Sequence, residues 1–233
     1  MSCLARGLAW DTMNPNACRA AMYLPLFIKT EQLRCLVVGG GAVAARKVEL
    51  LLASSCSLTV VAPEAGARIR TAAGCGLLTW HAREFRDGDC AGFQLVIAAT
   101  PHEVVNRIVS VEARKLGIPV NVVDSPQLCT AIFGATWREG PLVVSISSSS
   151  RAPFMASAVR DRIGEAAGGM GRWIEAAGQF RAAVRAEVRE PTARVRLYRL
   201  FAKCSRAGPP AALPQNRTLA DWLEWLERCR TPD

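Results

Sequence analysis

The sequence lacks the features that mark several large classes of protein. No apolar run approaches the roughly 18 residues that a membrane-spanning helix needs, so we expect no membrane partner. The nine cysteines are scattered without a C-x-x-C pair, which predicts reduced, mostly buried thiols in a cytoplasmic protein rather than a cysteine metal site. The two histidines, His81 and His102, are too far apart in the sequence to suggest a histidine metal site.

Lysine is also scarce, with four residues, so arginine supplies nearly all of the net charge of +9. Three interpretations of this charge remain open. The arginines can be solvated helix faces in an arginine-rich proteome, they can hold an acidic small-molecule substrate, or they can bind nucleic acid. The sequence carries no zinc finger, basic zipper region or aromatic RNA-binding signature, and we therefore expect no nucleic-acid partner.

The N-terminal 21 residues have no clear periodicity and no apolar core of the kind that a secretory signal contains. Met22 then opens the run Met-Tyr-Leu-Pro-Leu-Phe-Ile, which is typical of the start of a folded segment. We expect residues 1–21 to be a flexible extension or an over-called start.

Strand and helix patterns alternate between residues 33 and 123. The predicted strands 34–38, 57–61 and 94–99 are apolar almost throughout, as strands covered on both faces of a sheet must be. The alternation of strands and helices indicates an α/β fold with a Rossmann-like, doubly wound parallel sheet. The predicted strands are 34–38, 57–61, 77–80, 94–99 and 119–123, and the predicted helices are 42–53, 65–73 and 103–116.

The pattern changes after Gly134. One more strand is predicted at 141–146, followed by a polar serine loop and a helix over 154–166 that ends at two glycines. Two amphipathic helices, 173–188 and 191–204, come next. Thr218-x-x-Asp221 is a plausible capping box for a last helix, whose Trp and Leu stripe is predicted to be core or interface.

The most informative segment joins the apolar strand 34–38 to an alanine-rich helix through three glycines. The spacing G-x-G-x-x-A falls on Gly39, Gly41 and Ala44. In a dinucleotide-binding unit the first glycine permits a tight turn, the second lets the backbone approach the pyrophosphate, and the small third residue lets helix and strand pack closely. The helix N-terminus adds free N–H groups and a positive dipole end. We predict a dinucleotide site here, with a tight bend of no ligand role as the alternative.

Glu64 is the candidate for the acidic residue that binds the ribose of the cofactor. It lies 23 residues after Gly41 (64 − 41), near the spacing of about 20 residues that such sites use. No arginine adjoins it in the sequence, and a carboxylate would repel a 2′-phosphate, which favours NAD over NADP. A helix-start acid on the dipole is the alternative interpretation.

Polar side chains also follow two other predicted strands. Thr100 ends one of them, with Asn106 on the helix that follows, and Asn121 and Asp124 end another. Ligands of such sheets bind at the carboxyl ends of the strands, and we therefore predict that Thr100 contacts the cofactor. Asp124 precedes Ser-Pro, so it suits a turn or a helix cap as well as it suits chemistry.

In their order and spacing, these segments resemble the precorrin-2 dehydrogenase/sirohydrochlorin ferrochelatase family, the N-terminal part of siroheme synthase. The resemblance runs from about Met22 to about Val188. Its motifs are Met22–Phe27, Val38–Lys47, Val60–Glu64, Ala98–Thr100 with Asn106, Asn121–Asp124, Gly140–Ser145 and the serine loop before Pro153.

The resemblance implies three regions and an activity. An NAD-binding domain is expected over residues 22–133, a small dimerisation region over 134–167 and a helical C-terminal domain over 168–233. The implied enzyme is a homodimeric oxidoreductase of siroheme (porphyrin) biosynthesis that oxidises precorrin-2 to sirohydrochlorin with NAD. In bifunctional members a lyase reaction follows, in which Fe²⁺ enters sirohydrochlorin, and no resident metal site is needed because the macrocycle supplies the iron ligands.

The resemblance also implies roles for individual residues. Asp124 falls on the catalytic aspartate, and Ser148 falls near the tetrapyrrole. Asn121 and Arg151 are further candidates for substrate binding, although an exposed helix face is the alternative for Arg151. The predicted NAD contacts are Gly39, Gly40, Gly41, Ala42, Val43, Pro63 and Glu64, together with Thr100.

Two stretches depart from the family pattern. The family usually has a Gly-Gly pair where this sequence has Ser149 and Ser150, and Phe-Ile-x-Pro where it has Ala131–Gly134. Serine does not adopt positive φ freely, so a different loop shape is expected. The departures motivate the alternative of a non-catalytic module that binds NAD or a tetrapyrrole. A different Rossmann oxidoreductase with a small acidic substrate is the third hypothesis.

Overall fold

The computed structural model describes residues 23–204, 214 and 218–228. The chain divides into two compact units, Met1–Phe133 and Gly134–Asp233, and each unit is described by itself. The extension predicted over residues 1–21 lies outside the described residues.

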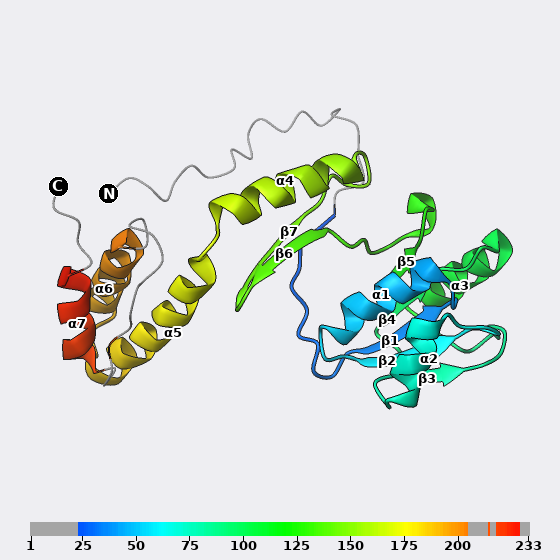
Figure 1. The fold of residues 1–233 in the computed structure, drawn as a ribbon, viewed down its shortest axis with the longest axis horizontal. Helices are drawn as coiled ribbons and strands as arrows, with labels where there is room; N and C mark the ends of the chain where they lie inside the picture. The colour runs from blue at the N-terminus through cyan, green and yellow to red at the C-terminus, as the bar shows by residue number, and fades with distance from the viewer. Residues whose placement is uncertain (1–22, 205–213, 215–217, 229–233) are drawn as a thin grey trace. The chain divides into compact units, whose positions relative to one another are not determined.

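The first unit is built on a five-stranded parallel sheet with the order β3-β2-β1-β4-β5 (Figure 1). Three helices, each following a strand, connect its strands. The strands are β1 (Arg34–Val38), β2 (Ser57–Val61), β3 (Thr79–His81), β4 (Leu95–Ala98) and β5 (Val120–Val122), and the helices are α1 (Ala42–Leu52), α2 (Ala67–Gly74) and α3 (Glu103–Lys115).

The apolar runs of the sequence form strands that are buried on both faces. In β1, Cys35 and Val37 point into the core beneath α1 and α2, whereas Leu36 and Val38 point into the core beneath α3. Successive side chains of a strand point to opposite faces, so only a continuous apolar run satisfies both cores. The prediction of a doubly wound α/β fold is confirmed.

The strands end level with one another at their carboxyl ends. Val38 of β1 is in register with Val61 of β2 and with Ala98 of β4, and Ala98 is in turn in register with Val122 of β5. The loops that follow these four strands therefore start from one edge of the sheet. Such an edge is where open α/β sheets bind ligands, beside the point where the strand order reverses.

The second unit begins with a β-hairpin, of which only the second strand was predicted. β6 (Ala135–Glu139) pairs antiparallel with β7 (Leu142–Ile146), and Gly140 turns between them at φ +53°. Strand β6 was not predicted, because its sequence Ala-Thr-Trp-Arg-Glu has no apolar run and it forms only as the partner of β7. Helix α4 (Pro153–Ala166) packs on this hairpin, and Gly164 leaves room for the Trp137 indole.

Three helices with an aromatic core complete the second unit. They are α5 (Met170–Glu187), α6 (Pro191–Cys204) and α7 (Leu219–Arg228), and α5 begins earlier than predicted, directly after Gly169 at φ +82°. Trp222 and Trp225 are buried among these helices, so the Trp and Leu stripe is core. The predicted capping box is confirmed, since the Thr218 N–H donates to Asp221 and the Asp221 N–H donates to the Thr218 hydroxyl.

The serine loop between β7 and α4 adopts the backbone conformation that glycine favours. Ser149 and Ser150 have φ values of +53° and +63°, contrary to the expectation that serines would avoid this region. Local hydrogen bonds accompany the turn, because the Ser149 N–H donates to the Ser147 hydroxyl and the Ala152 N–H donates to the Ser148 hydroxyl. The hydroxyls of the two preceding serines thus bond the backbone of the turn that Ser149 and Ser150 form.

The cysteines that the structure describes are free thiols, and most of them are buried. Burial raises the pKa of the Cys35 thiol to about 12, and it does the same for Cys90. A thiol with so high a pKa stays protonated at neutral pH and reacts poorly as a nucleophile. None of the described helices is long and apolar enough to span a membrane.

Candidate functional site

The turn between β1 and α1 admits only glycine at two positions. Gly39 has φ +122°, and a Cβ there would lie 2.3 Å from the backbone oxygen of Ala99. A Cβ on Gly40 would lie 1.9 Å from the backbone oxygen of Glu64. Backbone hydrogen bonds fix the turn, from the Gly39 N–H to Val61 and from the Gly66 N–H to Gly40. The turn is therefore held between the loops that follow β2 and β4.

Gly41 differs from its two neighbours because it faces open space. It is the N-cap of α1, and a Cβ built on it would meet no atom within 4 Å. No side chain caps this helix, and its first turn contains no acidic residue. The first N–H groups of a helix have no partner within it, so Ala42 and Val43 offer backbone donors to an anion. These features fit the pyrophosphate of a dinucleotide.

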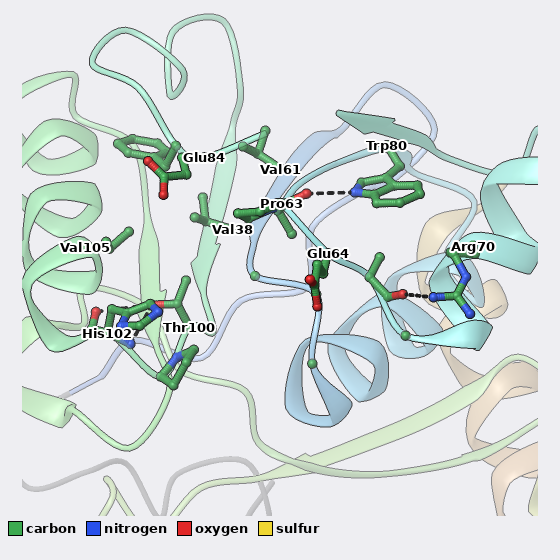
Figure 2. Close-up of a pocket in the computed structure, with 18 residues that line it drawn as sticks. Val38, Val61, Pro63, Glu64, Arg70, Trp80, Glu84, Thr100, His102 and Val105 are labelled. Atoms are coloured by element: carbon green, nitrogen blue, oxygen red, sulfur yellow. Dashed lines mark hydrogen bonds between the residues drawn. The ribbon is translucent and has the colours of Figure 1, made fainter. Parts of the chain in front are cut away.

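A cavity of about 980 Å³ opens at this turn (Figure 2). It falls within the size range of small-molecule and cofactor sites. All the predicted cofactor residues line it except Ala42 and Val43, whose backbone is the expected contact. The lining includes Gly39, Gly40, Gly41, Pro63, Glu64, Arg70, Trp80, Glu84, Phe85, Thr100 and His102.

The loop after β2 supplies one wall of the cavity. Glu64 is exposed and lies two residues before Gly66, the N-cap of α2, whose first turn holds no acid. Arg70 lines the same cavity although no arginine adjoins Glu64 in the sequence, and its guanidinium donates to the Ala65 backbone oxygen at 2.6 Å. The Trp80 indole N–H donates to the Ala62 oxygen, as Figure 2 shows. These two bonds fix the backbone on either side of Glu64.

The loop after β4 supplies the opposite wall. The Thr100 hydroxyl lies 2.8 Å from Oδ1 of Asn106, and the Asn106 amide donates back to the Thr100 carbonyl oxygen at 2.9 Å. Asn106 is buried on the first turn of α3, so this pair anchors the loop to the helix. Thr100 and His102 face the cavity from this loop (Figure 2).

The segment between β3 and β4 contributes Glu84 and Phe85 to the lining of the cavity. An ion pair between Arg83 and Asp89 holds this segment in place. The Arg83 guanidinium donates two hydrogen bonds to Asp89, of 2.6 and 2.8 Å, and the Arg86 N–H adds a third. The hydrogen bonds from Arg83 lower the pKa of the Asp89 carboxyl below its ordinary value. No motif or periodicity predicted this ion pair.

Replacing Asp89 with asparagine is expected to lower the Tm by about 2–4 °C at neutral pH, because charge-assisted hydrogen bonds are lost. A carboxyl whose pKa is lowered in the folded state stabilises the protein above its unfolded pKa, here near 3.8. That contribution disappears as the pH falls through the lower, folded pKa. Thermal melts should therefore give a Tm difference that is constant above about pH 5 and shrinks below about pH 4. Asp87→Asn, at an exposed position in the same loop, is the control; an equal loss in both variants would contradict the assignment.

Asp124 lies at the end of β5, on an exposed turn. Its φ is +57°, a conformation that aspartate tolerates better than most residues, and the Ser125 N–H donates to Val122 across the turn. Ala98 of β4 and Val122 of β5 are in register, and Thr100 and Asp124 each come two residues later. Asp124 therefore follows the strand next to the one whose loop, with Thr100, forms a wall of the cavity.

Side chains from the following loop hold the outer edge of β5. The Cys129 sulfur accepts the Val122 N–H at 3.1 Å and also lies 3.2 Å from the Val122 oxygen, to which the thiol can donate. The Thr130 hydroxyl accepts the Val120 N–H, and the Asn121 amide donates to Ala131 at 3.0 Å. We call Asn121, Cys129 and Thr130 the β5 clamp. Together they fix the turn that carries Asp124.

The three predicted substrate residues are divided between the two units. Asn121 belongs to the first, where its buried amide is a member of the β5 clamp. Ser148 and Arg151 belong to the second, where the Ser148 hydroxyl accepts a hydrogen bond from Ala152 and Arg151 is exposed. Their contact with a substrate stays a prediction. In the part of the chain that the structure describes, no group of three or more His, Cys, Asp or Glu side chains could hold a metal ion.

The sequence is similar to those of known proteins. Residues 26–135 match the family model described as "Putative NAD(P)-binding". The chain is 41% identical to the siroheme synthase of Methylococcus capsulatus over 192 residues, which is 82% of this chain and 40% of the relative. It is 43% identical to the siroheme synthase of Nitrosomonas eutropha over 171 residues, which is 70% of this chain and 35% of the relative. The chain thus spans well under half the length of these relatives.

Among solved structures, the chain is similar to "SirC, precorrin-2 dehydrogenase", with a TM-score of 0.68. That similarity covers 89% of this chain and 98% of the other, at 19% sequence identity, and it supports the fold. The homologues confirm the resemblance drawn from the sequence over the part of their length that the chain covers. The match of residues 26–135 confirms a nicotinamide dinucleotide as the cofactor, of the NAD(P) class that the family description names.

Proposed function

Because the chain is a homologue of the siroheme synthases over part of their length, we propose that it is an NAD-dependent precorrin-2 dehydrogenase. In this reaction precorrin-2 is oxidised to sirohydrochlorin, and NAD is the hydride acceptor. The observation that carries the proposal is the arrangement at the carboxyl edge of the sheet. The glycine turn and the loop after β4 line a cavity that suits a dinucleotide. The exposed carboxylate of Asp124 follows β5, the strand that pairs in register with β4.

The residues of the cavity would each bind one part of the cofactor. The turn at Gly39–Gly41 and the N-terminus of α1 offer backbone donors to the pyrophosphate, and Gly41 leaves the space it needs. The Glu64 carboxylate can accept hydrogen bonds from ribose hydroxyls. It would repel a 2′-phosphate, which favours NAD over NADP. When bound, NAD supplies the acceptor for the hydride.

Asp124 has the role of the base. Loss of a hydride from precorrin-2 removes two electrons and one proton, and a second proton must leave to give the neutral conjugated product. A carboxylate at the end of β5 can receive that proton. The same group could take the pyrrole N–H protons that Fe²⁺ displaces, so iron insertion with Fe²⁺ as a substrate is the natural second activity to test.

The deciding experiment is an anaerobic assay of the purified protein with precorrin-2 and NAD. We expect NADH and sirohydrochlorin to appear in equal amounts, and NADP to support a lower rate. Fe²⁺ added to the same cuvette then tests chelation. A folded protein that binds NAD but forms no product would contradict the proposal and favour a non-catalytic module that binds NAD or a tetrapyrrole.

A further inference from the structure

Lys47 is a half-buried cation that lacks an acidic partner. It lies on α1, in the helix that begins at the glycine turn. Among the ion pairs and side-chain hydrogen bonds of the described residues, none involves Lys47. Its ammonium nitrogen instead lies 4.6 Å from the centroid of the Phe133 ring. Burying a charge is costly unless it is paired, so this lysine is held where a counter-ion is missing.

The surroundings of Lys47 belong to the Asp124 end of the site. The aromatic ring comes from the segment that follows the β5 clamp, and both Asp124 and Cys129 are near enough to act on the ammonium electrostatically. Burial lowers the pKa of Lys47, and Arg46 lowers it further, whereas Cys129 and Asp124 oppose this change. Burial has the largest effect on this pKa, and the electrostatic interactions with Cys129 and Asp124 do not offset it.

The ring of Phe133 gives this cation a defined position. A cation over an aromatic face is held by the ring quadrupole, while its N–H groups can still meet an anion on the other side. Asp124 is exposed in the turn that follows β5, and it forms no ion pair with Lys47. An ammonium held over an aromatic ring and a separate carboxylate thus lie near enough to interact electrostatically.

We propose that Lys47 is a substrate-anchoring residue, whose ammonium binds a carboxylate of the tetrapyrrole beside Asp124. This inference rests on the proposed function, because precorrin-2 and sirohydrochlorin are rimmed by carboxylates. An entering carboxylate supplies the missing counter-ion and forms a charge-assisted hydrogen bond. The macrocycle edge is then fixed relative to the base.

The test compares Lys47→Met with Lys47→Arg and with the control Lys115→Met, at an exposed position near the end of α3. In Lys47→Met, we expect the KM for precorrin-2 and the Kd for sirohydrochlorin to rise roughly 10- to 100-fold. The Kd for NAD should stay within about twofold, because the pyrophosphate turn does not use this side chain. Lys47→Arg should retain most of the affinity, and Lys115→Met should match the wild type.

Stability is measured in parallel, because a folding defect would imitate a binding defect. Methionine removes an unpaired, half-buried charge and keeps an apolar stem, so the Tm should be unchanged or slightly higher. Unchanged affinity for sirohydrochlorin in Lys47→Met would overturn the proposal, and so would an equal loss of NAD affinity. If the wild type has no turnover, the proposed function fails, but binding of sirohydrochlorin to the wild type and to Lys47→Met still decides the role of Lys47.

Discussion

Replacing Asp124 with asparagine is expected to lower kcat for precorrin-2 oxidation by roughly 10²- to 10⁴-fold, which is the usual contribution of a positioned general base. Asparagine has nearly the same shape and also tolerates the left-handed backbone that Asp124 adopts, with φ +57°. The turn and the β5 clamp should therefore persist, and only the proton acceptor is lost. Steady-state kinetics with precorrin-2 at saturating NAD measures the effect.

Cofactor binding separates this role from a structural one. The Kd for NAD of Asp124→Asn, measured by calorimetry, should stay within about twofold of the wild type, since Asp124 does not line the dinucleotide cavity. A loss of NAD affinity as large as the loss of turnover would argue against the base. Asp161→Asn, at an exposed position in the second unit, is a control for the loss of one carboxylate charge.

The second large effect is expected from alanine at two adjacent glycines. Gly41→Ala should raise the Kd for NAD by roughly 10- to 100-fold while the Tm stays near that of the wild type. Its backbone is extended, with φ −78°, and a Cβ there meets nothing in the free protein, so the methyl group only occupies space that the pyrophosphate needs. Calorimetric titration with NAD and thermal melts measure the two quantities.

Gly40→Ala is the matched contrast. Its Cβ would lie 1.9 Å from the Glu64 backbone oxygen and 2.9 Å from the Ala65 Cα, so the backbone must move. We expect a loss of stability of about 1–3 kcal/mol, typical of overpacking, together with weaker NAD binding. If Gly41→Ala destabilises the protein as much as Gly40→Ala does, the open space at Gly41 is not a ligand space.

The parallel sheet could be predicted from the sequence because its signals are local. Strands β1 and β2 have the predicted bounds, since a run such as Leu36–Val38 suits only a strand with two covered faces. Strand β6 could not be predicted in this way. Its side chains alternate between half-buried and exposed, and its pairing with β7 arises from the hairpin rather than from its own composition.

The candidate site was predictable where residues follow strand ends. Gly39, Glu64 and Thr100 follow three neighbouring strands, and the carboxyl ends of parallel strands meet at one edge, so their grouping around one cavity follows from the fold. Arg70 and Lys47 could not be found this way. They lie on helices, and their positions depend on helix rotation and on contacts with distant segments, for which the sequence carries no periodic signal.

The β5 clamp also determines where the sheet ends on that side. An exposed edge strand offers its free N–H and C=O groups to any other extended chain and so invites aggregation. On the outer edge of β5, the Val120 N–H is taken by a hydroxyl, and the thiol of Cys129 lies against both the N–H and the C=O of Val122. The Val120 oxygen accepts the backbone N–H groups of Thr130 and Ala131. The loop after β5 thus blocks strand addition with two short side chains and two backbone donors, and it leaves the neighbouring turn free to face the solvent.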